Sequence, residues 1–354
     1  MNLTHKLHWS QTTITALGAA LLFGSTTPFA KQLVGKVSPL LLAGLLYLGS
    51  GIGLVLIRFI KDRAWHASGL FKTELPWLLG AIGFGGILAP IFFMIGLSRT
   101  SAATASLLLN LEAALTAVLA WVFFKESTDY RNIFGMLLIV AGGVVLTWTN
   151  RFTTQQWFGT LLIACACLCW AVDNNLTRKI SSADPLFISG TKGVVSGIVN
   201  ISLALAIGAT LPTRAHIVYA LWIGFLGYGV SLVLFVLSLR DLGTARTSAY
   251  FSTASFMGAV IAILFFHEPT SIFFWIAISL MGVGVWIHLS ENHVHIHTHE
   301  PLLHKHLHTH DTHHQHEHDF PWDGKEPHTH THKHKPLTHT HHHYPDIHHR
   351  HKHK

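Results

Sequence analysis

Charged residues are scarce in this sequence. They make up 12% of its 354 residues, whereas a typical soluble domain has about 25%. Cysteine is nearly absent too: Cys165, Cys167 and Cys169 lie within five residues, where a helix would place them poorly for a disulfide bond. Buried cysteines usually behave as small hydrophobic residues, with a soft-metal site as the alternative. Because half of the residues are hydrophobic, the composition excludes an ordinary soluble domain.

Motifs of catalysis are missing as well. The sequence has no nucleotide-binding glycine loop, no catalytic-triad pattern and no HExxH. Its glycine-rich runs lie within apolar stretches, where they favour tight helix packing. We therefore expect neither an enzyme nor a required cofactor. The first 290 residues hold 17 Lys and Arg against nine Asp and Glu, but these basic residues follow the predicted loops, which argues against nucleic acid as a partner.

Apolar stretches of about 20 residues, long enough to cross a bilayer, recur along the first 290 residues. We therefore predict an all-α integral membrane protein with ten transmembrane helices. Residues 13–31 count as the first helix rather than a cleaved signal, because Pro28 makes a poor cleavage context before Ala30. The ten predicted spans are 13–31, 39–58, 75–98, 102–124, 132–149, 157–177, 186–210, 217–239, 244–266 and 270–289.

Lys and Arg in the short loops predict the orientation. With the N-terminus inside, eleven of them fall in cytoplasmic segments and five in outer segments, as the positive-inside rule requires. We expect a multi-pass protein of the inner (plasma) membrane with both termini in the cytoplasm.

The chain repeats itself. "ASLLLNLEAALTAVLAWVFFKEST", from Ala105, aligns with "TSAYFSTASFMGAVIAILFFHEPT", from Thr247, at a register of 142 residues. Each copy holds five spans, and an odd number forces the second copy to enter from the opposite side of the membrane. We therefore predict two inverted repeats, 10–150 and 155–290. This arrangement is typical of secondary transporters with a site near the midplane, although a channel or a scaffold could also use it.

An ordered set of motifs resembles one transporter family. "LFGSTTPFAK" and "CWAVDNNLTRK" open the two halves, Pro39 and Pro185 begin the second spans, "VFFKE" and "LFFHEP" end the fourth, and the fifth spans are glycine-rich. The sequence is similar over residues 10–290 to the EamA family of the drug/metabolite transporter superfamily. This resemblance implies a ten-helix permease for small organic metabolites, often working outward by exchange or proton coupling.

Charged side chains within spans are costly and usually face a cavity or a partner. Glu112 lies in the middle of the fourth span, near Asn110, and aligns with Ala254 in the second repeat. We interpret it as the coupling residue, with a structural hydrogen bond as the alternative. Asp173 and Lys192 lie at similar distances from the turn near Ala183, so an ion pair is the plainest interpretation, ahead of substrate binding. The other candidates for the substrate site are Asn174, Asn175, Trp170, Tyr250 and Ser252.

Glu126 and Glu268 end matching spans on opposite membrane faces. Their symmetry favours a role in the fold, such as fixing the next turn, over chemistry.

Residues 291–354 form a tail that holds 24 of the 30 histidines. The tail lacks packing residues, so we expect disorder without metal. Repeated H-x-H spacing suits zinc, nickel, cobalt or copper(II); a polycation that forms at low pH is the alternative. The candidate ligands are His293, His295, His297, His299, His304, His306, His308, His310, His313, His314, His316 and His318.

Three functions follow from these features. The first is a permease exporting a small organic metabolite, with a metal-binding tail. The alternatives are efflux of a transition metal fed by the tail, and a metal-responsive membrane sensor. The expected partners are the lipid bilayer, a small-molecule substrate and metal ions, with a homodimer left open.

Overall fold

The computed structural model describes most of the chain up to residue 289 and four segments of the tail. The described residues are 3–62, 70–124, 130–147, 154–180, 183–235, 237–238, 250–289, 293–299, 303–308, 328–333 and 337–343. The chain divides into two units, Met1–Ser290 and Glu291–Lys354, and each is described by itself.

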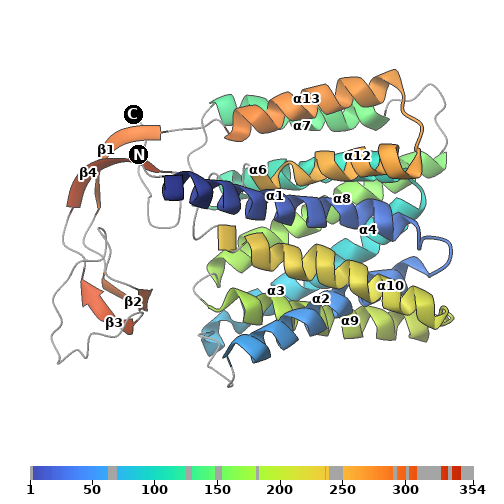
Figure 1. The fold of residues 1–354 in the computed structure, drawn as a ribbon, viewed down its shortest axis with the longest axis horizontal. Helices are drawn as coiled ribbons and strands as arrows, with labels where there is room; N and C mark the ends of the chain where they lie inside the picture. Colours follow the sequence, from blue (N-terminus) through green and yellow to red (C-terminus); the bar gives the residue numbers. More distant parts are fainter. Residues whose placement is uncertain are drawn as a thin grey trace. The chain divides into compact units, whose positions relative to one another are not determined.

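The described elements of the first unit are all helices (Figure 1). Lipid offers no hydrogen-bond partners, so the backbone groups of an apolar run of membrane length must bond within their own helix. Prolines begin two of the helices, where the missing N–H costs nothing. The helices of the first half are α1 (Leu3–Lys31), α2 (Pro39–Asp62), α3 (Leu75–Ala81), η2 (Ile82–Leu88), α4 (Ala89–Ser98), α5 (Ala102–Leu108), α6 (Asn110–Phe124) and α7 (Tyr130–Thr147), with a short 3-10 turn, η1, at Lys72–Glu74. Those of the second half are α8 (Thr154–Lys179), α9 (Pro185–Ala206), α10 (Arg214–Gly224), η3 (Phe225–Val230), α12 (Ala254–Phe266) and α13 (Ile272–Leu289).

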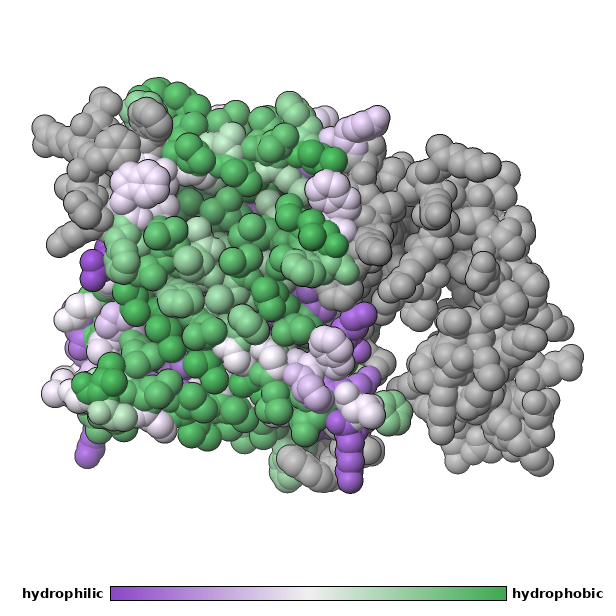
Figure 2. All heavy atoms as spheres, turned by 180° about the vertical axis from the view of Figure 1, so that it is seen from behind, coloured by the Kyte–Doolittle hydropathy of each residue, from purple (hydrophilic) through white to green (hydrophobic). Residues whose placement is uncertain are grey.

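Eight described helical segments are long and apolar enough to span a membrane, and two shorter apolar helices fall on the ninth and tenth predicted spans. Three spans are built from more than one element: α3, η2 and α4 form the third, α5 and α6 the fourth, and α10 and η3 most of the eighth. Large apolar side chains such as Phe59, Phe123 and Trp286 are exposed, and Figure 2 shows apolar residues covering much of one side of this unit. These surfaces suit lipid contact, and the all-α membrane architecture is confirmed.

The helices of the two halves pack on one another in a symmetric pattern. The second and seventh spans, α2 and α9, lie side by side, as do the fifth and tenth, α7 and α13 (Figure 1). The contact of α1 with α12 has its counterpart in that of α8 with α6. Exchanging the two halves leaves this pattern unchanged, as two inverted five-helix repeats require.

Close helix contact depends on glycine where α2 crosses α9. A Cβ atom added to Gly51 would lie 2.3 Å from the backbone nitrogen of Val194, and one added to Gly193 would lie 2.6 Å from the Cα of Gly51. Small residues let membrane helices approach this closely, and dispersion forces then hold them together. The α2–α9 crossing therefore ties the two repeats along their length.

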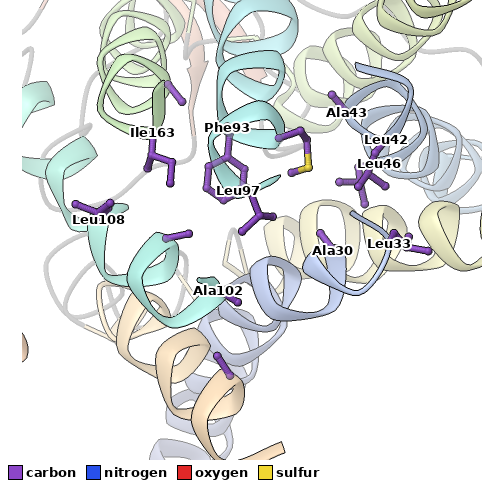
Figure 3. Packing of buried hydrophobic residues seen from close by; sticks show 14 of the residues in the cluster. Ala30, Leu33, Leu42, Ala43, Leu46, Phe93, Leu97, Ala102, Leu108 and Ile163 are labelled. Carbon is purple, nitrogen blue, oxygen red and sulfur yellow. The ribbon is translucent and has the colours of Figure 1, made fainter. Parts of the chain in front are cut away.

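The main hydrophobic core lies toward one membrane face. We name this the distal face; it carries the turns 31–38, 99–101, 207–213 and 267–271, and the opposite, proximal face carries the turn at 180–184 and the end of α13. Figure 3 shows Ala30, Leu97 and Ala102 from neighbouring helices meeting in this core. Phe93 and Ile163 fill the space beside them (Figure 3). The distal half of the helix bundle is thus densely packed.

The second unit contains four strands in the described residues. β1 (His293–His299) pairs with β4 (Leu337–His343), and β2 (Leu303–His308) pairs with β3 (His328–Lys333), both antiparallel. In β1 and β3 His alternates with Val, Ile or Thr, and a period of two with β-branched residues fits a strand.

Candidate functional site

The fourth span is interrupted where it carries its carboxylate. α5 ends at Leu108 and α6 begins at Asn110, so Glu112 lies in the first turn of α6, at the middle of the span. One carboxylate oxygen of Glu112, Oε1, accepts a 2.9 Å hydrogen bond from the side-chain amide of Asn174 on α8. The same amide donates to the hydroxyl of Thr116, one helical turn further, at 3.3 Å. A carboxylate of the first repeat is thus held by an amide of the second.

An ion pair lies next to this contact along α8. The Nζ of Lys192, on α9, is 2.5 Å from Oδ2 of Asp173, the residue before Asn174. Thr177 donates to the other oxygen, Oδ1, at 3.0 Å. The Asp173 side chain is 4% exposed and that of Lys192 is 20% exposed, so both charges are largely withdrawn from solvent and lipid. The structure thus brings together the two residues that the α8–α9 hairpin was expected to pair.

A π-helical turn brings backbone carbonyls to the same region. In η2 the hydrogen-bonding register is i to i+5, and two of its carbonyls accept bonds from side chains instead. Tyr47 donates to the carbonyl of Gly85 at 2.7 Å and Trp170 donates to it at 3.1 Å. Asn200 donates to the carbonyl of Gly86 at 3.1 Å. The second repeat has its own π-helical turn, η3, at the equivalent place in its third span.

Glycine is required at this π-helical turn because α8 and α9 approach its backbone. A Cβ atom on Gly85 would lie 1.9 Å from Oδ2 of Asp173, and one on Gly86 would lie 1.8 Å from Oγ of Ser196. Gly83, two residues before Gly85, has nothing within 4 Å of its Cβ position. The interpretation of this glycine run as a packing feature was correct but incomplete, because its carbonyls also accept bonds from polar side chains. We name these carbonyls and the side chains around them the polar cluster: Tyr47, Trp170 and Asn200 bond the carbonyls, and Asp173–Lys192 and Glu112–Asn174 lie beside them.

Aromatic rings surround the polar cluster. The ring of Tyr47 lies 5.6 Å from that of Tyr228, and the ring of Phe93 lies 5.5 Å from that of Trp170, between centroids. Phe23 lies 5.8 Å from Tyr228. Rings at these separations present both apolar faces and, for Tyr and Trp, a polar edge. The site therefore combines a carboxylate, an ion pair and aromatic surfaces.

Asn174 is exposed although it lies close to the core of the bundle. The lipid-facing side of α8 is marked by Leu161, 54% exposed, and Leu168, 44% exposed. At about 100° per residue, Asn174 lies about 220° and about 240° around the helix from them. Asn174 therefore lies on a different side of α8 from these leucines, where its amide meets the partly exposed Glu112 of α6.

Other predicted residues are placed away from these bonds. Asn110 is buried, and its Nδ2 has no hydrogen-bond partner among the described residues. Tyr250 and Ser252 lie just before α12 and take part in none of the bonds above. Cys167 is buried and donates to the carbonyl of Leu108, which fits a packing role.

The predicted metal ligands of the tail are placed only by the backbone. His293, His295, His297 and His299 lie on β1, and His304, His306 and His308 lie on β2. His310, His313, His314, His316 and His318 lie outside the described residues.

Sequence reasoning missed Tyr47, Thr116 and the Gly85 carbonyl. Tyr47 and Thr116 looked like ordinary polar residues of an apolar helix, and a π-helical turn leaves no periodic signal. The repeat itself was the available clue, because both third spans carry a glycine-rich run at the same register, "GFGG" and "GYG".

The sequence matches the model of the EamA-like transporter family twice, over residues 11–148 and 157–290. The chain belongs to this family. It is similar to an uncharacterized transporter of Methanothermobacter thermautotrophicus, 29% identical over 77% of this chain and 84% of the relative. The uncharacterized transporter YyaM of Bacillus subtilis is 24% identical over 77% of this chain and 91% of its own. One solved structure, 18% identical, shares the fold with a TM-score of 0.58 over 78% of this chain and 95% of that one.

The family match shows that the protein is a multi-pass membrane transporter. Each matched segment covers one five-helix repeat, and both stop before the tail. The part of the chain that matches the EamA family thus ends where the histidine-rich segment begins.

Proposed function

We propose that this EamA transporter is a secondary-active permease that exports a small organic metabolite, with Glu112 and Asn174 at the centre of its substrate and coupling site. The supporting observation is the Glu112 carboxylate itself. It lies at mid-span, where a helix of the first repeat meets a helix of the second, and no described cation pairs with it. A carboxylate held there can exchange a proton or bind a polar group of the cargo.

The neighbouring residues favour an organic cargo over a metal ion. The rings of Tyr47, Trp170 and Tyr228 provide apolar contact area, which organic molecules use and hydrated metal ions do not. Asp173 is already neutralised by Lys192. Within the described part of the spans, no three His, Cys, Asp or Glu side chains come together as a metal site would require.

A ligand screen by thermal unfolding tests the choice of cargo. Ligands that bind only the folded protein raise its unfolding temperature. We expect members of a panel of small organic metabolites to stabilise the purified protein and a version truncated after Ser290, but not Glu112→Gln. Glu74→Gln is the matched control, because Glu74 lies in the 3-10 turn η1 before α3 and accepts a bond from the backbone N–H of Phe71. Stabilisation of the truncated protein by zinc, nickel or cobalt alone would instead indicate metal efflux.

We also infer that the tail binds a divalent transition metal, Zn, Ni, Co or Cu. The support is the strand register, because six pairs of histidines stand directly opposite one another. Residues opposite each other in an antiparallel pair lie on the same face, with Cβ atoms about 5 Å apart, a spacing at which two imidazoles can share an ion. The pairs are His293–His343, His295–His341, His297–His339, His304–His332, His306–His330 and His308–His328.

Calorimetric titration of the full-length protein with Zn²⁺ and Ni²⁺ tests this inference. We expect micromolar binding that disappears after truncation at Ser290. Equal heats with and without the tail would contradict it. The alternative is a metal-responsive sensor that does not transport. In that case the tail should still bind metal, and no organic compound should stabilise the protein in the screen above.

We infer that both termini face the cytoplasm of an inner-membrane protein. The support is the distribution of Lys and Arg, which places eleven in the inner loops and five in the outer ones. Reporter fusions after Ser290 test it. A reporter enzyme that is active only outside the cytoplasm should show no activity when fused there. Activity of that fusion would show that the orientation is the reverse of the one inferred.

A further inference from the structure

A carboxylate of the second repeat holds a helix of the first repeat at the distal face. Oε1 of Glu268 accepts a 2.8 Å hydrogen bond from the backbone N–H of Ala102, and Oε2 accepts a 2.7 Å bond from that of Ala103. The sequence predicted a role in the fold for Glu268, with fixing the next turn as the example. The structure shows instead that it caps α5, a helix 165 residues earlier in the chain.

The chain around Glu268 directs it toward α5. His267, which ends α12, has a φ of 53° in the left-handed region, and this sharp turn stops the helix. At α5, Ser101 accepts from the N–H of Thr104 at 3.1 Å. The free N–H groups of the first turn of α5 are therefore satisfied by one local residue and by Glu268.

Lys31 holds the other side of the same turn. Its Nζ donates to the carbonyls of Leu97 and Thr100, each at 2.6 Å. These carbonyls close α4, where a cation is favourable. The turn between the third and fourth spans is thus bound at its carbonyls by the end of α1 and at its amides by the segment after α12. We name Glu268, Lys31 and this turn the distal clamp.

The helices joined by the distal clamp are packed tightly beneath it. A Cβ atom on Gly24 of α1 would lie 2.1 Å from the carbonyl oxygen of Ala254 on α12, and one on Gly258 would lie 2.7 Å from Oγ of Ser106 on α5. Ser106 is 1% exposed and its hydroxyl has no partner among the described residues. α12 thus approaches α1 at its first residue and α5 one turn later, too closely for a larger side chain at either glycine.

The two halves of the bundle therefore differ. The distal half is closed by the clamp and by the core of Figure 3, whereas Asn174, toward the proximal end of α8, is exposed. A transporter with one site must open it to each side in turn. α12 and α5 belong to different repeats, so the bonds of Glu268 must break if the repeats separate at the distal face.

We propose that Glu268 closes the distal side of the transport path, and that releasing Ala102 and Ala103 is the step that opens it. This inference rests on the transport activity of the family and on no particular cargo. Glu268 is a positioning residue, since it acts on the helix ends and not on the transported molecule. A helix cap without this role would change the stability of the protein and leave the balance of its conformations alone.

Thiol labelling of Ser106→Cys tests the proposal. Cys165, Cys167 and Cys169 are first replaced by alanine, and a membrane-impermeant maleimide is applied to right-side-out and to inverted vesicles. We expect Glu268→Gln to increase labelling about tenfold, from the distal side only, because losing one charge-assisted hydrogen bond shifts a two-state balance by about that factor. Lys31→Gln should act in the same direction. Glu74→Gln, which removes the charge of a carboxylate that accepts a backbone N–H within one repeat, should change nothing.

Two results would overturn the proposal. One is unchanged labelling in folded, monodisperse Glu268→Gln and Lys31→Gln protein. The other is an increase from both sides of the membrane together with a lower unfolding temperature, which would mark Glu268 as a structural cap alone. Neither readout requires the cargo to be known, so a failure here leaves the choice between organic and metal cargo untouched.

Discussion

The carboxylate of Glu112 and the amide of Asn174 meet at 2.9 Å across the boundary between the two repeats. Glu112 belongs to the fourth span and Asn174 to the sixth, and these spans approach one another through α6 and α8. If the repeats rock against each other during transport, this contact lies where their relative movement can change the surroundings of the carboxylate.

Replacing Asn174 separates positioning from chemistry at this contact. Asn174→Ala leaves the carboxylate in place but removes the amide that orients it, so we expect transport to weaken by about tenfold, the cost of about one hydrogen bond to a charged group. Glu112→Gln should abolish coupled transport. Export of the identified cargo from cells measures both. Equal loss in the two variants would mean that Asn174 does more than orient Glu112.

Loss of either partner of the Asp173–Lys192 ion pair should strongly destabilise the protein, as it does for buried ion pairs. Lys192→Met leaves the largely buried Asp173 charge unpaired, and we expect a loss of stability of about 3 kcal/mol. Thermal unfolding in detergent measures it. Exchanging the charges, Asp173→Lys with Lys192→Asp, should recover part of the loss. If the exchanged protein is no more stable than Lys192→Met, the pair is not the main interaction of either side chain.

The π-helical turn η2 allows a matched pair of alanine substitutions. Gly85→Ala would place a Cβ atom 1.9 Å from Oδ2 of Asp173, so we expect a drop in unfolding temperature and loss of transport. Gly83→Ala meets nothing within 4 Å and should be tolerated, with helix propensity slightly in its favour. Similar behaviour of the two variants would contradict the close approach of α8 to this turn.

The sequence was sufficient to predict the architecture because hydropathy and repetition are direct physical signals. Apolar runs predicted the spans, an odd number of spans per copy predicted the inversion, and equal distances from one turn predicted that Asp173 would meet Lys192. Each of these inferences needs only local periodicity and chain length.

Contacts between distant residues could not be predicted in the same way. Nothing near Glu268 indicates that its partners are Ala102 and Ala103, because backbone amides are not encoded by residue type. The bond from Tyr47 to the Gly85 carbonyl depends on a π-helical register that glycine permits but does not require. The antiparallel pairing of tail strands such as β1 and β4 depends on which of many similar His-Thr segments meet.

The most direct test measures export and cell metal together in cells that make the full-length protein, Glu112→Gln, or the protein truncated after Ser290. We predict that the full-length and truncated proteins release the same organic compound into the medium, that Glu112→Gln releases none, and that any change in cellular zinc, nickel or cobalt follows the tail alone. If the full-length protein lowers cell metal and Glu112→Gln abolishes that effect, the spans carry metal, and the account of an organic permease with a metal-binding tail is wrong.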